Sequence, residues 1–314
     1  MSGILLIGAN GQLGWEVARR ARVAGLRCYA LGKEELDITE PDAVSLTVKR
    51  LAPSIAINAA AYTNVDKAES DAFVFAVNRD GAANLANACA AADIPLIHIS
   101  TDYVFDGTKR TPYTEDDPVS PLGAYGRSKL AGEEAVRALC PKHVILRTAW
   151  VYGNHGHNFV KTMLRLGRER DRLRVVSDQF GNPTFAGDLA DAVLTLAQRL
   201  QSGVWPDRGF GTFHCAGAGM TTWYDLARAI FDIAGPKLEQ FPEIEAISTA
   251  DYPTPAKRPH YSVLDCSRLA RTHNIAMRSW KLGLVEMLEA ALAQPLGKGR
   301  RNGGSSHANL KGSL

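Results

Sequence analysis

A tyrosine and a lysine stand four residues apart in the segment YGRSK, as Tyr125 and Lys129. The segment follows SPLGA and begins a predicted helix, so both side chains fall on one face of that helix. An ammonium group beside a phenol favours the ionised phenol and lowers a pKa that starts near ~10, which suits an acid catalyst. Because such pairs also occur by chance on protein surfaces, the pair alone does not predict an active site.

A threonine stands at the end of an apolar run before this pair. In HISTDYVFDG, residues 98–107, Thr101 comes at the carboxyl end of a predicted strand, where open α/β sheets place their ligands. The alternative is an ordinary hydroxyl at a strand end. Three such groups from one sheet edge nevertheless form a constellation that is typical of an enzyme.

A glycine-rich turn, GANGQLG, stands near the start of the sequence. Gly8, Gly11 and Gly14 lie between the apolar run ILLIG and a helical pattern. A strand before and a helix after are the context in which such a turn lets the backbone approach the pyrophosphate of a dinucleotide. A turn that only serves packing is the alternative interpretation.

The segment after the second predicted strand bears on the choice of nucleotide. It reads LGKEEL, where an acid for the ribose 2′-hydroxyl normally stands. Lys33 could pair there with the 2′-phosphate of NADP, or be a solvated surface lysine. Asp37 and Ile38 follow and could hold the adenine edge, although Asp37 could equally be an N-cap or turn residue.

Elements that would position these residues follow from the apolar pattern. Through the first 150 residues, continuously apolar runs alternate with helical patterns, which is typical of parallel strands covered on both faces. We therefore predict an α/β protein with a Rossmann-type doubly wound parallel sheet over residues 1–150. Residues 151–295 are expected to form mainly a smaller α/β substrate-binding lobe, and could contribute elements back to the first domain. Residues 296–314, rich in glycine and serine, are expected to be a disordered or appended tail.

Composition narrows the class of protein. The 314 residues are 46% hydrophobic, and 36 Lys and Arg against 33 Asp and Glu give no reason to expect nucleic acid as a partner. Five cysteines are scattered singly without a CxxC pair, which is typical of reduced thiols. No apolar run approaches the ~20 residues that span a bilayer. We therefore expect a cytoplasmic protein without a membrane partner.

Taken together, several motifs resemble one known family. GANGQLGWE, NAAAYTNVDKAE, ISTDYVFDG, YGRSKLAGE and RTAWVYG follow one another in this order, and NPTFAGDLAD and RPHYSVLDCSRL come later. From residue 3 to about 290 the sequence resembles the dTDP-4-dehydrorhamnose reductase family of extended short-chain dehydrogenases/reductases. The resemblance implies reduction by NAD(P)H of the C4 ketone of dTDP-6-deoxy-L-lyxo-4-hexulose to dTDP-β-L-rhamnose, the last step of dTDP-L-rhamnose synthesis for cell-surface polysaccharide. NADPH is the expected cofactor, and NADH stays open.

The resemblance also implies a role for each residue. Tyr125 would donate the proton, Lys129 would hold the nicotinamide ribose and tune the phenol, and Thr101 would bind the reacting oxygen. The sugar nucleotide would contact Thr101, Asp102 and Trp150, although Trp150 could instead be a core residue. The cofactor would be bound by Gly8, Gly11, Gln12, Leu13, Gly14, Lys33, Asp37, Ile38, Ala60, Ala61, Tyr62, Tyr125 and Lys129.

Two positions bear on how closely the sequence follows this family rather than others of the superfamily. Sugar-nucleotide dehydratases tend to have Asp-Glu after the threonine, whereas Asp102 and Tyr103 stand here, which disfavours elimination. Tyr261 replaces the Asn that the family usually has in RPxNSxLD, and this bears on the local shape of the substrate lobe.

The sequence also leaves open whether the protein binds a metal ion. Some members of the family form homodimers through Mg²⁺ held by surface glutamates, and Glu16 matches one such position, while Asp188 stands one residue away from the second. A homodimer stays open, and no metal is expected otherwise. His155 and His157 resemble a metal-binding pair, but without a third ligand a glycine-rich loop is the better interpretation.

Two other functions remain as alternatives. One is a non-catalytic homologue of the regulatory subunit of methionine adenosyltransferase, against which the intact Thr101, Tyr125 and Lys129 argue. The other is a nucleotide-sugar 4-epimerase, which would keep NAD bound through its cycle.

Overall fold

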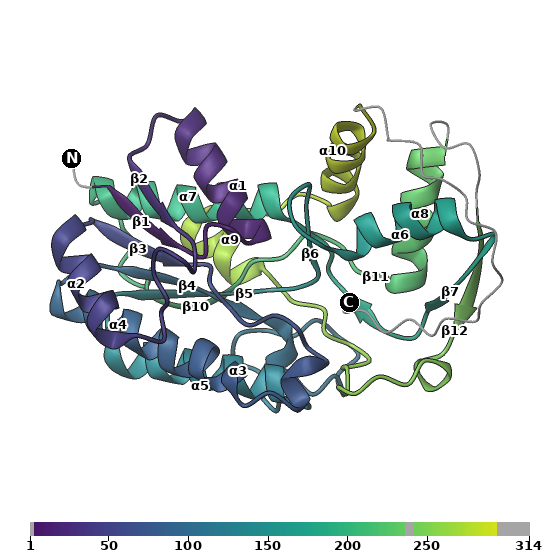
Figure 1. Ribbon diagram of the computed structural model, residues 1–314, viewed down its shortest axis with the longest axis horizontal. Coiled ribbons are helices and arrows are strands. Elements are labelled where there is room, and N and C mark those ends of the chain that lie inside the picture. The colour runs from purple at the N-terminus through teal and green to yellow at the C-terminus, as the bar shows by residue number, and fades with distance from the viewer. Residues whose placement is uncertain (1–2, 236–241, 294–314) are drawn as a thin grey trace.

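A computed structural model describes residues 3–235 and 242–293 of the chain. The tail expected over residues 296–314 lies outside the described residues. The chain forms two lobes, a large one built on a six-stranded sheet and a small one of helices and short strands, on the right of Figure 1.

Six parallel strands form the centre of the large lobe, in the order β10-β5-β4-β3-β1-β2. Their bounds are β1 (Ile4–Ile7), β2 (Cys28–Leu31), β3 (Ile55–Asn58), β4 (Leu96–Thr101), β5 (His143–Thr148) and β10 (Gly211–His214). Strands β1 and β3 are buried along their whole length, as expected where helices cover both faces. The prediction of a Rossmann-type parallel sheet is confirmed.

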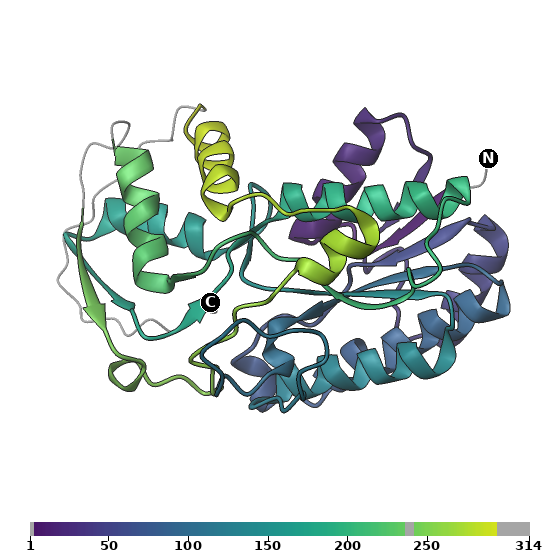
Figure 2. The same ribbon diagram turned by 180° about the vertical axis from the view of Figure 1, so that it is seen from behind.

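Helices lie on both faces of this sheet (Figures 1 and 2). One face carries α1 (Gln12–Val23), α7 (Ala186–Ser202) and α9 (Ser267–His273), and the other carries α2 (Pro41–Leu51), α4 (Gly81–Ala91) and α5 (Ala124–Leu139). The connections contain the short turns η1 (Lys67–Glu69), α3 (Phe73–Phe75), η2 (Ala76–Asp80) and η3 (Asp102–Val104).

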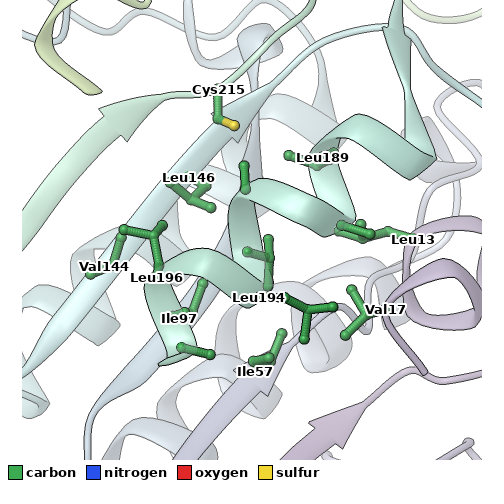
Figure 3. Packing of buried hydrophobic residues seen from close by; sticks show 14 of the residues in the cluster. Leu13, Val17, Ile57, Ile97, Val144, Leu146, Leu189, Leu194, Leu196 and Cys215 are labelled. Carbon is green, nitrogen blue, oxygen red and sulfur yellow. The ribbon is translucent and has the colours of Figure 1, made fainter. Parts of the chain in front are cut away.

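Helix α7 lies at the centre of the main hydrophobic core (Figure 3). Its Leu189, Leu194 and Leu196 are buried between helix α1 and the sheet. The residues that they join in this core include Leu13, Val17, Ile57, Ile97, Val144 and Leu146. Both α7 and β10 come after residue 150 in the sequence, yet they complete the core and the edge of the large lobe.

The small lobe has its own core between three helices and a two-stranded parallel sheet. The helices are α6 (Phe159–Glu169), α8 (Trp223–Ala234) and α10 (Trp280–Ala293), and the strands are β7 (Arg172–Val176) and β12 (Glu243–Ile247). Short pairs join β6 (Val151–Tyr152) to β9 (Thr184–Phe185) and β8 (Phe180–Gly181) to β11 (Thr221–Thr222). The turn η5 (Thr249–Asp251) follows β12.

The chain passes more than once between the lobes, so segments far apart in sequence meet at their junction. After η5 it leaves the small lobe and returns to the large lobe, where it forms α9 (Figure 2). Within the described residues, no helix has the length and apolar character that crossing a membrane requires.

Candidate active site

The glycine-rich turn lies at the carboxyl end of β1, next to the loop that follows β3. These strands are neighbours in the sheet, but the chain visits β2 between them, and the crevice at such a reversal is where open α/β sheets bind nucleotides. Gly8 has a positive φ of 80°, and a Cβ on it would lie 2.5 Å from the backbone nitrogen of Ala60. A Cβ on Gly14 would lie 2.1 Å from the Gly8 oxygen. Both positions therefore require glycine for the close fold of the turn.

Gly11 differs, because the space beside it is open. A Cβ there would have one neighbour, the Gly8 oxygen at 3.4 Å. Gly11 is the N-cap of α1, has no side-chain cap bond, and no acidic residue stands in the first turn of the helix. The first backbone N–H groups, those of Gln12 and Leu13 among them, therefore suit a phosphate. The Leu13 side chain points the other way, into the core against α7.

The residues expected around the adenosine lie beyond β2. Lys33 is exposed, stands 3.7 Å from a carboxylate oxygen of Asp37, and lies over the ring of Phe73 at 5.3 Å. Asp37 accepts hydrogen bonds from the Thr39 backbone and hydroxyl, and these bonds, the backbone one foremost, lower its pKa. Ile38 is buried, and a Cβ on Gly81 would lie 2.5 Å from its side chain. Asp37 therefore acts as a turn residue, which was one of the alternatives for it in the sequence.

The loop after β3 carries Ala60, Ala61 and Tyr62. Its backbone is fixed by two amide side chains, because Asn58 accepts from the Ala60 N–H at 3.1 Å and Asn78 accepts from the Tyr62 N–H at 2.8 Å. All three residues are half-buried. They form a rigid wall of the crevice beside the glycine turn.

A cleft of about 470 Å³ lies between the lobes. From the large lobe it is lined by Gln12, Thr101, Asp102, Tyr125 and the strand-end residue Trp150. The structure therefore brings Gln12 of the glycine turn, the catalytic candidates Thr101 and Tyr125, and the substrate candidates Asp102 and Trp150 to one cavity, whereas Lys129 lies behind its wall.

The catalytic candidates converge from β4 and α5. The Thr101 hydroxyl donates to a carboxylate oxygen of Asp102 at 3.1 Å and accepts from the Tyr103 N–H. The Lys129 ammonium, 2% exposed, donates to the backbone carbonyl of Ile99 at 2.7 Å. Tyr125 packs edge-on against the ring of Tyr103, with ring centres 5.9 Å apart.

The expected acidity of Tyr125 is not present in this structure. Burial raises the pKa of Tyr125 to about 12, hydrogen bonding with Thr101 opposes the rise, and the charge of Asp102 adds to it. The Lys129 charge is not among the causes. The prediction that the lysine lowers the pKa of this phenol was therefore wrong for the protein alone, because helical spacing fixes a shared face but not the direction of the ammonium.

Lys129 and Asp102 are themselves shifted toward neutrality. Burial lowers the pKa of Lys129 to about 8, against the opposing charge of Glu133. Burial also raises the pKa of Asp102 to about 7, while Ser262 and Thr101 act in the other direction. One oxygen of the Asp102 carboxyl is buried without a hydrogen-bond partner. A buried polar group of this kind at a cavity wall is available to a ligand.

Trp150 lies in the cleft rather than in a closed core. It is half-buried and stacked on Trp223 of the small lobe, with ring centres 3.5 Å apart and planes within 8°. Its φ of 47° is in the left-handed region that bulky residues rarely adopt. Gly181 leaves room for its ring, since a Cβ there would lie 2.5 Å from Cε2.

Much of the opposite wall was missed by sequence reasoning. It includes Arg174, Gln179, Trp223, Tyr252 and Arg258. Trp223 belongs to none of the motifs quoted from the sequence, and its indole N–H donates to Gln179 at 3.2 Å. Arg258 stands in the motif RPHYSVLDCSRL, which supported the family resemblance but did not assign a function to this arginine.

The metal site suggested at Glu16 is not supported. Glu16 is 2% exposed, and its carboxylate is bound by Arg19 at 2.8 Å and Arg20 at 3.3 Å. Asp188 is bound by Arg278 at 2.7 Å. Two neighbouring guanidinium groups already neutralise Glu16, so it has no free charge for Mg²⁺.

The two histidines do not form a metal site either. The ring of His155 stacks on Trp15, and its Nε2 lies 3.0 Å from the Asn10 carbonyl oxygen. Among residues 3–235 and 242–293, no group of three His, Cys, Asp or Glu side chains could hold a metal ion.

Comparison with known proteins is consistent with this geometry. The family model described as RmlD substrate binding domain matches residues 1–293. A dTDP-4-dehydrorhamnose reductase of Sinorhizobium fredii is 43% identical over 292 residues, covering 93% of this chain and 98% of the relative.

Solved structures agree. The crystal structure of a dTDP-4-dehydrorhamnose reductase from Clostridium acetobutylicum superposes with a TM-score of 0.86 and 41% identity, covering 92% of this chain and 99% of that one. The enzyme of that name from Bacillus anthracis, solved in complex with NADP, has a TM-score of 0.84 and 36% identity, covering 92% and 99% of the two chains.

Proposed function

The chain belongs to the RmlD substrate binding domain family, and from this premise we propose that it is a dTDP-4-dehydrorhamnose reductase, an NADPH-dependent oxidoreductase acting on a nucleotide sugar. The reaction is reduction of the C4 ketone of dTDP-6-deoxy-L-lyxo-4-hexulose to the alcohol of dTDP-β-L-rhamnose. The observation that carries the proposal is the meeting of Thr101, Tyr125 and Gln12 of the glycine turn in one interlobe cleft.

The glycine turn fits a dinucleotide. An uncapped helix start with open space at Gly11 offers backbone donors to a pyrophosphate. A reduced nicotinamide, when bound, supplies the hydride that reaches C4 of the sugar. Gly8, Gly11, Gln12, Leu13 and Gly14 are assigned to the pyrophosphate, and Ala60, Ala61 and Tyr62 to the middle of the cofactor.

The adenosine end supports a preference for NADPH. Lys33 is exposed, and its contacts with the Asp37 carboxylate at 3.7 Å and the Phe73 ring at 5.3 Å are both weak, so it can turn toward a 2′-phosphate. Asp37 and Ile38 are assigned to the adenine side. We therefore propose NADPH as the preferred cofactor, with NADH used less well.

Tyr125 is the proton donor for the oxygen at C4. A phenol that burial keeps protonated carries its proton at every physiological pH, and Thr101 beside it hydrogen-bonds the same reacting oxygen. As the ketone becomes an alkoxide, its basicity rises far above that of the phenol, so the proton moves from Tyr125 to the sugar.

Lys129 supplies a positive charge near the proton donor. Its ammonium is anchored on the backbone carbonyl of Ile99 in β4. We assign two of its N–H groups to the nicotinamide ribose and to the developing phenolate, which a nearby cation stabilises. This is the state in which the expected lowering of the pKa of Tyr125 would appear.

The sugar nucleotide is assigned to the remaining walls of the cleft. Asp102 offers an unpaired buried oxygen to a sugar hydroxyl, and the stacked rings of Trp150 and Trp223 offer an apolar face. A homodimer and a cytoplasmic location remain predictions, and no metal ion enters the proposed function.

The experiment is NADPH oxidation with the 4-keto sugar nucleotide as substrate. The purified chain should oxidise NADPH only when the sugar is present, and the product should be dTDP-β-L-rhamnose rather than its C4 epimer. NADPH without sugar is the control. No oxidation would favour a non-catalytic homologue, and a purified chain with stoichiometric bound NAD would favour a 4-epimerase.

A further inference from the structure

One partly buried ion pair at the cleft has no part in the reaction as described. Arg258, with 8% of its side chain exposed, binds Asp66, with 24% exposed. The pair is bidentate, since one guanidinium N–H donates to Asp66 Oδ1 at 3.1 Å and another to Oδ2 at 3.0 Å. Asp66 stands in NAAAYTNVDKAE and Arg258 in RPHYSVLDCSRL, and the proposed function gives neither of these two residues a role.

The pair joins two segments that belong to different lobes. Asp66 follows the nucleotide-binding loop of the large lobe. The segment of Arg258 is bound to strand β8 of the small lobe, because the Phe180 N–H donates to the His260 carbonyl and the Ser262 N–H to the Phe180 carbonyl, both at 2.8 Å. The ion pair therefore ties this crossing segment to the large lobe beside the cleft.

The segment of Arg258 also packs tightly against the segment ISTDYVFDG, which carries Thr101. Gly107, at the end of ISTDYVFDG, has a φ of 79°, and a Cβ on it would lie 2.6 Å from the Pro259 side chain. Arg258 and Tyr103 line the same cleft, and the guanidinium lowers the pKa of the Tyr103 phenol by charge and hydrogen bonding, against the larger raising effect of burial.

Tyr103 in turn contacts the proton donor. Its ring meets the ring of Tyr125 at 79°, with centres 5.9 Å apart, and a Cβ on Gly126 would lie 2.2 Å from the Tyr103 carbonyl oxygen. The backbone of Tyr103 is thus pressed against the first turn of α5. A displacement of the Tyr103 side chain would reach Tyr125 directly.

We propose that Arg258 is a positioning residue, which fixes the ring of Tyr103 and thereby the orientation of the proton donor Tyr125. Asp66 holds the guanidinium in place for this role. The inference rests on the proposed reductase function and adds to it a link from the small lobe to the proton donor.

The test compares Arg258→Met, Tyr103→Phe and the double variant in the NADPH oxidation assay. Arg258→Met should lower kcat by about 10–100-fold, as a misplaced catalytic group does. The KM for the sugar and the Kd for NADPH should change by less than about threefold, because the Arg258 guanidinium is already bound by the Asp66 carboxylate. The double variant should be no slower than Arg258→Met, since both changes interrupt one path.

Two further readouts separate positioning from general damage. The solvent isotope effect on kcat should increase in Arg258→Met, because proton transfer from a misplaced phenol becomes slower than the other steps. Arg258→Lys should be intermediate, since a lysine keeps the positive charge and can pair with Asp66 but lacks the planar fork that binds both carboxylate oxygens. The matched control is Arg278→Met, which removes another arginine–carboxylate pair, of 2.7 Å, away from the cleft and should leave kcat unchanged.

Several results would overturn the inference. A raised KM with unchanged kcat in Arg258→Met would make Arg258 a substrate-binding residue. Independent, multiplying losses in the double variant would show that Arg258 does not act through Tyr103. If Arg258→Met does not fold, Arg258→Lys and Tyr103→Phe provide the test instead. A wild-type kcat in both of these variants would reject the positioning role of Arg258. A wild-type chain that never oxidises NADPH with the sugar would instead reject the proposed function itself.

Discussion

Changing Glu133 to glutamine should destabilise the whole large lobe. Glu133 of α5 is fully buried, and its carboxylate accepts from Arg147 at 2.9 and 2.7 Å and from Ser100 at 2.6 Å. Arg147 is 3% exposed, so the neutral amide would leave a buried guanidinium without its counter-charge. Breaking a buried pair in this way costs about 3–5 kcal/mol. At about 2 °C per kcal/mol for a chain of this size, the Tm should fall by roughly 6–10 °C.

The effect should depend on pH in a definite direction. Burial alone would raise the pKa of Glu133, but the hydrogen bonds and charge of Arg147 hold that pKa below its ordinary value of 4.5. A carboxyl with a lowered pKa contributes stability above its unfolded-state pKa and loses it as pH falls through the folded-state pKa. The difference between wild type and Glu133→Gln should therefore be full at pH 7 and shrink below about pH 4.5.

The assay is urea unfolding followed by circular dichroism at neutral and acidic pH. The control is Glu169→Gln in α6, where the Arg165–Glu169 pair has a comparable distance, 2.7 Å, but side chains 58% and 51% exposed. That change should cost at most about 0.5 kcal/mol. A loss of under ~1 kcal/mol for Glu133→Gln, or a loss that grows in acid, would refute the reasoning.

Three further predictions concern the cleft. Because burial lowers the pKa of Lys129 to about 8 and the charged form is the active one, kcat/KM should be full below that pH and fall above it, and a flat profile to pH 10 would contradict the role. Lys33→Asp should raise the KM for NADPH selectively, and an equal loss with NADH would reject the 2′-phosphate assignment. Trp150→Ala should raise the KM for the sugar by roughly 2–10-fold, the value of one lost aromatic contact, with NADPH unaffected. A lower Tm with unchanged KM would instead make Trp150 a packing residue.

The fold of the large lobe could be predicted because its signals are local. Continuous apolar runs gave β1, β3, β4 and β5, and the glycine turn stands where a strand meets a helix. The sequence could not assign α7 to a lobe. Its pattern shows that one face is buried, but only the folded chain shows that α1 and the sheet cover it.

The active site could likewise be predicted only where its signals are local. Spacing placed Tyr125 and Lys129 on one helix, but burial, which decides the pKa of each, depends on what packs around them. Arg258 and Trp223 come from distant segments, so no local pattern could place them at the cleft. The sequence did contain a local indication against Glu16 as a metal ligand. Arginines stand three and four residues later on the same helix, where they can pair with its carboxylate.

The central claim is that Tyr125 delivers the proton to the sugar, and Tyr125→Phe tests it most directly. The variant keeps the ring packing against Tyr103 and removes only the hydroxyl, so NADPH binding, followed by fluorescence titration, should be preserved. Single-turnover reduction of the 4-keto sugar should then fall by about 10²–10⁴-fold, the usual contribution of a general acid. A folded phenylalanine variant that binds NADPH and reduces the sugar at the wild-type rate would contradict the mechanism.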